Sequence, residues 1–154
     1  MRLISSAFDN NGTIPVKYAY PRVAGGQNIS IPLEWTDAPA GTRSFALAMV
    51  DISSRNWVHW MVINIPANVA SLSEGASVIK MPSGVKELAN TFGSIGYGGP
   101  EPPPGAGPHD YVTTVYALNV DEISLPLQSS YNNFLRAIEG KVLAKASLTG
   151  RFSW

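Results

Sequence analysis

Hydrophobic and polar residues alternate along much of this chain with the period of β-strands. Apolar side chains recur at every second position between residues 29 and 35, as in a strand with one buried face. The runs 45–50 and 57–65 are apolar at nearly every position, and their lengths predict central strands covered on both faces. The short polar connection 51–56 is typical of a hairpin, so we expect these two strands to pair.

The last third of the chain predicts two further strands and one helix. Segment 111–119 carries apolar residues on both faces, whereas segment 142–152 carries them at even positions. A helical period between the candidate caps Ser129–Ser130 and the stop signal Gly140 predicts one short helix over about residues 130–139. We also expect one or two helical turns at 85–89. The residues with helical spacing are Tyr131, Phe134, Leu135 and Ile138.

Composition supports an all-β architecture. Fourteen glycines and twelve prolines make up 26 of the 154 residues, and they stand between short runs of β-branched and aromatic residues. With 45% hydrophobic residues the chain has ample material for a core, and its length suits one domain over residues 1–154. The sequence therefore predicts a single all-β domain with one short helix.

Charge and cysteine content exclude several classes of function. Eleven basic and eleven acidic side chains cancel, so no net field would attract the protein to nucleic acid or to an anionic membrane. The absence of cysteine excludes disulfides, thiolate catalysis, iron–sulfur clusters and cysteine-rich zinc sites. Residues 1–9 show no signal-peptide pattern, and the longest apolar stretch, 57–65, is far shorter than the roughly 18–20 residues that cross a bilayer. We expect a cytoplasmic protein without a membrane segment.

One segment can form neither a helix nor a central strand. Between Phe92 and Pro108, six glycines and five prolines occupy eleven of seventeen positions. Prolines stiffen a backbone and glycines allow it to approach a ligand closely, so we expect a rigid, shaped wall. A flexible linker is the alternative, and the strong strand that follows at His109 and Tyr111 argues against it.

The only two histidines, His59 and His109, lie at junctions between predicted strands and loops, where functional side chains of sheet proteins usually occur. His59 shares strand parity with Met61 and Ile63, so we expect its imidazole to point into an apolar face. A buried imidazole needs a hydrogen-bond partner, and Asp51, across the predicted hairpin, is the nearest candidate. Such a pair is either structural or functional.

Three interpretations of Asp51, His59 and His109 stay open on the residues alone. They could form a metal triad, although no H-x-D dyad is present. A Ser–His–Asp hydrolase would use Ser53 or Ser54, although the sequence has no G-x-S-x-G elbow. In the third interpretation, two imidazoles in one cavity and the amides of the glycine-rich loop hold an anion without breaking a bond. A sugar-binding platform of tryptophans is weaker than simple packing for these residues: Trp35, Trp57, Trp60 and Trp154.

Two motifs and an N-terminal pattern together resemble a known family. The run 57–66 contains W-x-H-W, and the run 96–111 reads GYGGPEPPPGAGPHDY. The N-terminal pattern extends from Phe8 to Asp51. In combination they resemble the phosphatidylethanolamine-binding protein family, especially its prokaryotic branch, over essentially the whole chain.

The resemblance implies a β-sandwich of two antiparallel sheets with Greek-key connections and a small ligand pocket at one end. In the family this pocket binds phosphate-like anions, including the phosphoethanolamine head group. By the resemblance, Asp51, His59 and His109 are pocket residues. Further implied ligand-binding residues are Pro103 and Tyr111 in the wall, Trp57 at the rim, and Gly99 and Glu101 in the loop.

Two departures from the family pattern concern the pocket. Of the family's D-P-D-x-P motif only Asp51 is retained, because Ile52 and Ser53 replace the first proline and the second aspartate. Glu101 stands where the family usually has a small residue, and a carboxylate there would either repel an anion or lie outside the mouth.

We therefore expect a non-enzymatic protein without a cofactor that binds a small anion such as phosphate, sulfate or phosphoethanolamine. The alternative is an interaction module, because family members regulate kinases or inhibit proteases. A hydrolase or metal-dependent enzyme ranks third, because the sequence pairs no catalytic base with a nucleophile.

Overall fold

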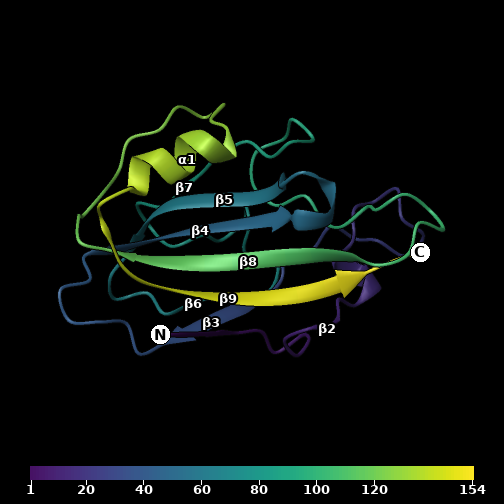
Figure 1. Cartoon of the computed structure of the whole chain (residues 1–154), viewed down its shortest axis with the longest axis horizontal. Coiled ribbons are helices and arrows are strands. Elements are labelled where there is room, and N and C mark those ends of the chain that lie inside the picture. The colour runs from purple at the N-terminus through teal and green to yellow at the C-terminus, as the bar shows by residue number, and fades with distance from the viewer.

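Two β-sheets form a sandwich in the computed structural model, which describes residues 1–154 (Figure 1). The smaller sheet has the order β1 (Arg2–Ile4), β3 (Leu33–Thr36), β6 (Ser71–Leu72). The larger sheet has the order β2 (Gly12–Thr13), β9 (Val142–Phe152), β8 (His109–Leu118), β4 (Ser44–Asp51), β5 (Trp57–Pro66), β7 (Lys86–Glu87). The prediction of an all-β sandwich with one short helix is confirmed.

The ladders are antiparallel with one exception, since the short β2 pairs with β9 in parallel. Strand β4 lies between β5 and β8, although β8 comes much later in the chain. The chain therefore leaves the sheet after β7 and returns beside β4, as in a Greek key. This return brings the start of β8 next to the end of β4.

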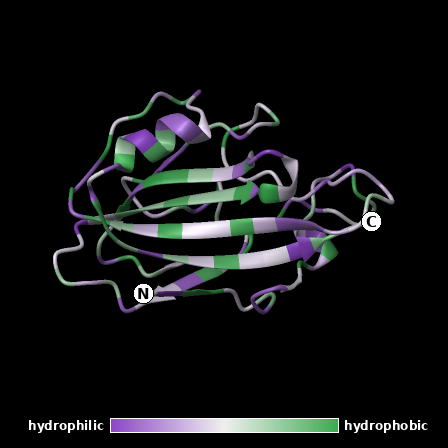
Figure 2. Ribbon diagram, in the orientation of Figure 1, coloured by the Kyte–Doolittle hydropathy of each residue, from purple (hydrophilic) through white to green (hydrophobic).

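Strand β4 is buried at all eight positions because it separates two hydrophobic clusters. The first cluster lies between the two sheets, and the second lies under helix α1 on the outer face of the larger sheet. Figure 2 shows nearly continuous hydrophobic colour along β4 and β5, and alternation along β8 and β9. The predicted central hairpin is thus confirmed, and so are the two faces of β8, where Tyr111 joins the first cluster and Tyr116 the second.

The predicted helix is confirmed as α1 (Tyr131–Ile138), which buries Phe134 and Ile138 against the larger sheet. Ser130 is its N-cap: the Ser130 hydroxyl accepts the Asn133 amide at 3.0 Å, and the Asn133 side chain accepts the Ser130 amide at 3.1 Å. Gly140 follows the helix with a positive φ of 77°. No helix of the structure is both long enough and apolar enough to cross a membrane.

Two secondary-structure predictions were wrong. Residues 85–89 form no helical turn, because Lys86 and Glu87 pair as β7 with the open edge of β5. Regular strand structure between 29 and 36 is limited to Leu33–Thr36, although the side chains of Ile31, Leu33 and Trp35 are buried at the expected alternate positions. Two short 3₁₀ turns complete the fold: Val16–Tyr18 (η1) and Ile52–Ser54 (η2).

Candidate functional site

A cavity of about 390 Å³ opens at the end of the sandwich where β4 ends and β5 begins. This end lies at the right of Figure 1, near the C-terminus. We call this hollow the end cavity. Its wall combines aromatic rings with two carboxylates, one guanidinium and one imidazole. The lining residues are Arg22, Asp51, Ser54, Trp57, His59, Thr91, Phe92, Glu101, Pro103 and Tyr111.

A β-bulge in the β4–β5 hairpin turns His59 toward this cavity. Met49 pairs with Trp60, but the next residue of β4, Val50, pairs with Val58, which leaves His59 as the extra residue. A bulge re-aims a side chain relative to the regular alternation of a strand, and such irregularities are common next to functional sites.

The predicted parity of His59 with Met61 and Ile63 is therefore wrong. Met61 and Ile63 belong to the second cluster under the helix, whereas the His59 ring packs edge-on against Tyr111 of the first cluster, with ring centroids 5.0 Å apart. Because the bulge shifts the alternation by one residue, His59 and Met61 face opposite sides of the sheet.

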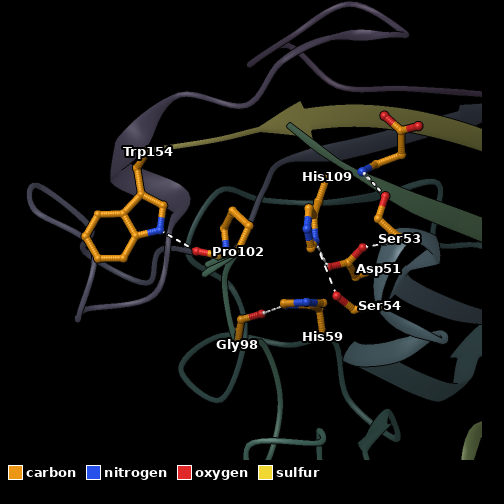
Figure 3. A network of polar contacts seen from close by, with 9 residues as sticks. Asp51, Ser53, Ser54, His59, Gly98, Pro102, His109 and Trp154 are labelled. Atoms are coloured by element: carbon orange, nitrogen blue, oxygen red, sulfur yellow. Dashed lines mark hydrogen bonds and ion pairs between the residues drawn. The ribbon is translucent and has the colours of Figure 1, made fainter. Parts of the chain in front are cut away.

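Asp51, the last residue of β4, pairs with Trp57 of β5 and with Tyr111 of β8. Its Oδ1 accepts the Ser53 amide at 2.8 Å, and its Oδ2 accepts Nδ1 of His109 at 2.8 Å (Figure 3). The partner of Asp51 is thus His109, and the predicted His59–Asp51 pair is not formed. Both carboxylate oxygens are already engaged by donors of the protein.

His59 is only 2% exposed and is held by the glycine-rich loop. Its Nδ1 lies 2.6 Å from the carbonyl oxygen of Gly98, and since a carbonyl only accepts, Nδ1 must carry the proton. Burial lowers the pKa of His59, and this outweighs the backbone contacts with Gly98 and Gly99 and the charges of Asp51 and Glu101, all of which favour protonation. At pH 7 the imidazole is therefore neutral, and its Nε2, which bonds to no protein group, is an acceptor.

His109 begins β8 and is not among the residues that line the end cavity, so the lining includes only His59 of the two histidines. Besides Asp51, its Nδ1 contacts the Ser54 hydroxyl at 3.3 Å. In a hydrolytic triad the serine and the aspartate engage opposite ring nitrogens, whereas both contacts here fall on Nδ1. The geometry therefore does not support the Ser–His–Asp interpretation.

Tyr111 supplies the one unpartnered hydroxyl of the end cavity. The residue is 1% exposed, and its buried hydroxyl makes no hydrogen bond of normal length and angle, although the Asp51 carboxylate lies near it. Burial raises the pKa of Tyr111, and the charge of Asp51 and a weak interaction of the hydroxyl with that carboxylate act in the same direction, so the phenol keeps its proton. A buried hydroxyl without a partner is costly and calls for an explanation, and a ligand in the cavity would provide one.

The mouth of the cavity carries an ion pair that the sequence did not indicate. Arg22 reaches Glu101 with two bonds, Nε to Oε2 at 2.5 Å and Nη2 to Oε1 at 2.7 Å. Glu101 thus lines the cavity with its charge paired. Trp57 lies at the rim, 39% exposed, with its ring edge-on against Phe92.

The glycine- and proline-rich loop is fixed at several points, which rules out a flexible linker. The Gly98 amide donates to the carbonyl of His59 at 2.8 Å, and the Gly99 amide donates to the Asn28 side chain at 2.7 Å. The Trp154 indole bonds to the carbonyl of Pro102 (Figure 3). Gly99 lies outside the lining and its amide is already used, so the predicted contribution of this amide to an anion cradle is not available.

Two other sequence interpretations find no support in the geometry. No group of three or more His, Asp or Glu side chains is placed to hold a metal ion. The tryptophans form no shared platform, because Trp35 and Trp60 are buried in the first cluster while Trp57 and Trp154 lie apart at the rim and on the loop.

Sequence reasoning missed Arg22, Thr91 and Phe92, and it considered Ser54 only as a nucleophile. Arg22 belongs to no motif, and 79 positions separate it from Glu101. Phe92 begins the loop, where its aromatic ring next to a glycine-rich run was the one available signal.

The buried neutral His59 predicts a loss of stability in acid. Its folded-state pKa lies below the unfolded value of about 6.5, so the unfolded chain binds the proton first as the pH falls. The free energy of unfolding is unaffected by the titration of His59 above about pH 6.5. Below that pH it decreases by up to about 1.4 kcal/mol per pH unit, because the unfolded chain binds the proton more tightly. Urea denaturation between pH 5 and 7.5 should show this slope in the wild type and a smaller one in His59→Asn. Equal slopes would contradict a neutral buried imidazole.

Comparison with known proteins places the geometry in context. A family model described as phosphatidylethanolamine-binding protein matches residues 4–153. A UPF0098 protein of Aquifex aeolicus is 37% identical over 154 residues, covering 99% of this chain and 88% of that protein. UPF0098 protein YbhB of Escherichia coli is 35% identical over 159 residues, covering 99% of this chain and 100% of YbhB. The crystal structure of E. coli YbcL, a member of the mammalian PEBP family, has a TM-score of 0.92 at 30% identity and covers 99% of this chain and 98% of YbcL.

Proposed function

This chain belongs to the phosphatidylethanolamine-binding protein family, and on that premise we propose that its end cavity binds a phosphate monoester or a similar small anion. Family membership supports a ligand-binding protein of regulatory kind, and the relatives named above carry no enzymatic name. The resemblance seen in the sequence, including that to the prokaryotic branch, is confirmed.

The proposal rests above all on the buried, unpartnered hydroxyl of Tyr111. Besides this hydroxyl, the unpartnered groups are one donor, the Glu101 amide, and one acceptor, Nε2 of His59. The Glu101 amide has no partner within the protein, while the oxygens of both lining carboxylates, Asp51 and Glu101, are engaged by donors of the chain. A surplus of hydrogen-bond donors favours a ligand rich in acceptor oxygens, which a phosphoryl group supplies.

Because of His59, we expect anion binding to be accompanied by the uptake of a proton. Its Nε2 is an acceptor while the ring is neutral, so it cannot donate to a fully deprotonated anion. Binding of such an anion requires one proton on Nε2, or one on the phosphoryl oxygen that faces it. Either arrangement takes up one proton, because the free imidazole is neutral at pH 7.

The size of the cavity favours a ligand larger than a bare ion. Water occupies about 30 Å³ per molecule in the liquid, so the end cavity, at about 390 Å³, has the volume of roughly a dozen waters. A phosphoryl group with a small organic substituent fits this volume. The aromatic rings of Trp57 and Phe92 would contact that substituent near the mouth.

Replacement of Tyr111 by Phe tests the proposal, because it should weaken anion binding without lowering the stability of the fold. The variant should bind inorganic phosphate about tenfold more weakly, because one hydrogen bond to a charged group is lost. Its free energy of unfolding without ligand should stay equal or rise, because an unsatisfied buried hydroxyl is removed. Isothermal titration calorimetry and urea denaturation measure the two quantities.

Tyr97→Phe is the matched control, because the Tyr97 hydroxyl is buried but donates to the carbonyl of Tyr18 at 2.8 Å. It should lose about 1 kcal/mol of stability and retain phosphate affinity. Parallel titrations with phosphoethanolamine show whether an attached ammonium group adds affinity. If neither phosphate, sulfate nor phosphoethanolamine binds the wild type, the anion proposal fails and an interaction module becomes the better interpretation.

A further inference from the structure

We propose that Arg22 is the residue that receives the anion at the mouth of the end cavity, and that Glu101 is an internal competitor which holds Arg22 until the anion displaces it. This inference rests on the proposed function. It assigns a binding role to a residue outside every sequence motif and a selectivity role to the carboxylate that departs from the family pattern.

The contact between the two residues has the geometry in which Arg binds oxyanions. Nε and Nη2 of Arg22 each donate to a different oxygen of Glu101, at 2.5 and 2.7 Å. This parallel pair of bonds suits a carboxylate and a phosphoryl group equally well. Glu101 therefore occupies the same face of the guanidinium that an incoming phosphoryl group would use.

The two partners differ in their freedom to move. The Arg22 side chain is 66% exposed, whereas that of Glu101 is 18% exposed and belongs to the fixed loop. An ion pair exposed to this extent is weak, because water and salt screen it. Exchange of Glu101 for another anion therefore requires movement of Arg22 alone.

Stacked aromatic rings keep Arg22 beside the mouth when it leaves Glu101. The guanidinium carbon lies 4.8 Å from the centroid of the Tyr20 ring, and this ring stacks on Phe92 with centroids 4.1 Å apart. The Phe92 ring in turn packs edge-on against the His59 ring, with centroids 5.6 Å apart. The Tyr20 amide donates to the carbonyl of Pro100, which fixes the Arg22 segment to the loop that carries Glu101.

Charge explains why the competitor matters for selectivity. Asp51 and Glu101 are the carboxylates of the lining and Arg22 is its one permanent cation, while His59 is neutral when free. Apart from a proton taken up by His59, an anion therefore gains a full positive charge only by taking Arg22 from Glu101. A carboxylate ligand offers Arg22 nothing that Glu101 lacks, whereas a phosphate dianion carries more charge and a third oxygen. The pair thus favours phosphate monoesters over carboxylates.

The test measures inorganic phosphate affinity of four proteins by calorimetry: the wild type, Glu101→Gln, Arg22→Gln and the double variant. Glu101→Gln should bind about tenfold more tightly because the charged competitor is gone, and Arg22→Gln about tenfold more weakly. In the double variant the tightening should disappear, since it depends on Arg22. Wild-type affinity for acetate should be much lower than for phosphate, and Glu101→Gln should narrow that difference.

The chain contains a matched control pair. Arg43 binds Asp121 with the same two-bond geometry, at 2.9 and 2.7 Å, and neither residue lines the end cavity. Arg43→Gln and Asp121→Asn should leave phosphate affinity unchanged, which excludes an effect of net charge alone. Urea denaturation of each variant checks that the fold is retained. Arg22→Lys keeps the positive charge but loses the two parallel N–H donors of the guanidinium, so its phosphate affinity should lie between those of the wild type and Arg22→Gln.

Two results would overturn the inference while leaving the proposed function intact. One is unchanged phosphate affinity of Glu101→Gln in a wild type that binds phosphate. The other is equal tightening by Glu101→Gln with and without Arg22, which would mean that Glu101 acts by repulsion alone. A wild type that binds no phosphate at all would end both proposals.

Discussion

The affinity of the end cavity for sulfate is expected to fall about tenfold per pH unit between the pKa of His59 in the free protein and its pKa in the complex. Burial lowers the first of these values below about 6.5, although the charges of Asp51 and Glu101 act in the opposite direction. An anion against Nε2 stabilises the protonated ring and so raises the second value. Within this interval each binding event takes up one proton, and affinity falls as the pH rises.

Sulfate is the cleaner probe, because phosphate esters gain charge with a second pKa of about 6. Calorimetry from pH 5.5 to 8.5, repeated in two buffers of different ionisation enthalpy, gives both the affinity and the number of protons taken up. His59→Gln keeps a donor for the Gly98 carbonyl but cannot titrate, so its profile should be nearly flat. A wild-type profile as flat as that of His59→Gln would mean that no proton on His59 accompanies binding.

Gly99→Ala is expected to destabilise the protein by about 3 kcal/mol. A Cβ at this position would lie 2.0 Å from the carbonyl oxygen of Tyr18 and within 2.8 Å of backbone atoms of Ala19 and Tyr20. These are backbone atoms, so no rotamer change relieves the overlap and the segment must move. Because Tyr20 bonds to the loop at Pro100, anion affinity should fall together with stability.

Gly105→Ala in the same loop is the control for this variant. Its Cβ would meet nothing within 4 Å, and only the positive φ of 75° opposes the substitution, at a cost of about 1 kcal/mol. Urea denaturation of both variants measures the difference. Equal destabilisation by the two substitutions would show that close packing of Gly99 against residues 18–20 is not what positions the loop.

The sequence predicted those parts of the fold that depend on local pattern. The apolar runs of β4 and β5 leave few arrangements other than a central hairpin. The helix is bounded by Ser130, which caps its N-terminus, and by Gly140, whose positive φ follows its C-terminus. The prediction of a helical turn at residues 85–89 was wrong because the strand that these residues pair with, β5, is distant in the sequence, and a short stretch of sequence does not show this pairing.

The sequence predicted which residues line the cavity better than it predicted which of them bond to one another. Asp51, His59 and Tyr111 do line one cavity, but the bulge at His59 depends on how two strands register, which residue alternation does not encode. Asp51 pairs with His109, while Nδ1 of His59 is engaged by the Gly98 carbonyl of the loop. The bond from Arg22 to Glu101 is a tertiary contact between two loops, and no local pattern in the sequence predicts it.

A crystal structure of the protein grown with phosphate near pH 6 tests the central claim most directly. The account predicts density for one phosphate in the end cavity, within hydrogen-bonding distance of the Tyr111 hydroxyl and Nε2 of His59, with Arg22 turned from Glu101 toward it. Phosphate at a concentration that saturates binding in solution, yet absent from this cavity or bound elsewhere on the molecule, would contradict the account.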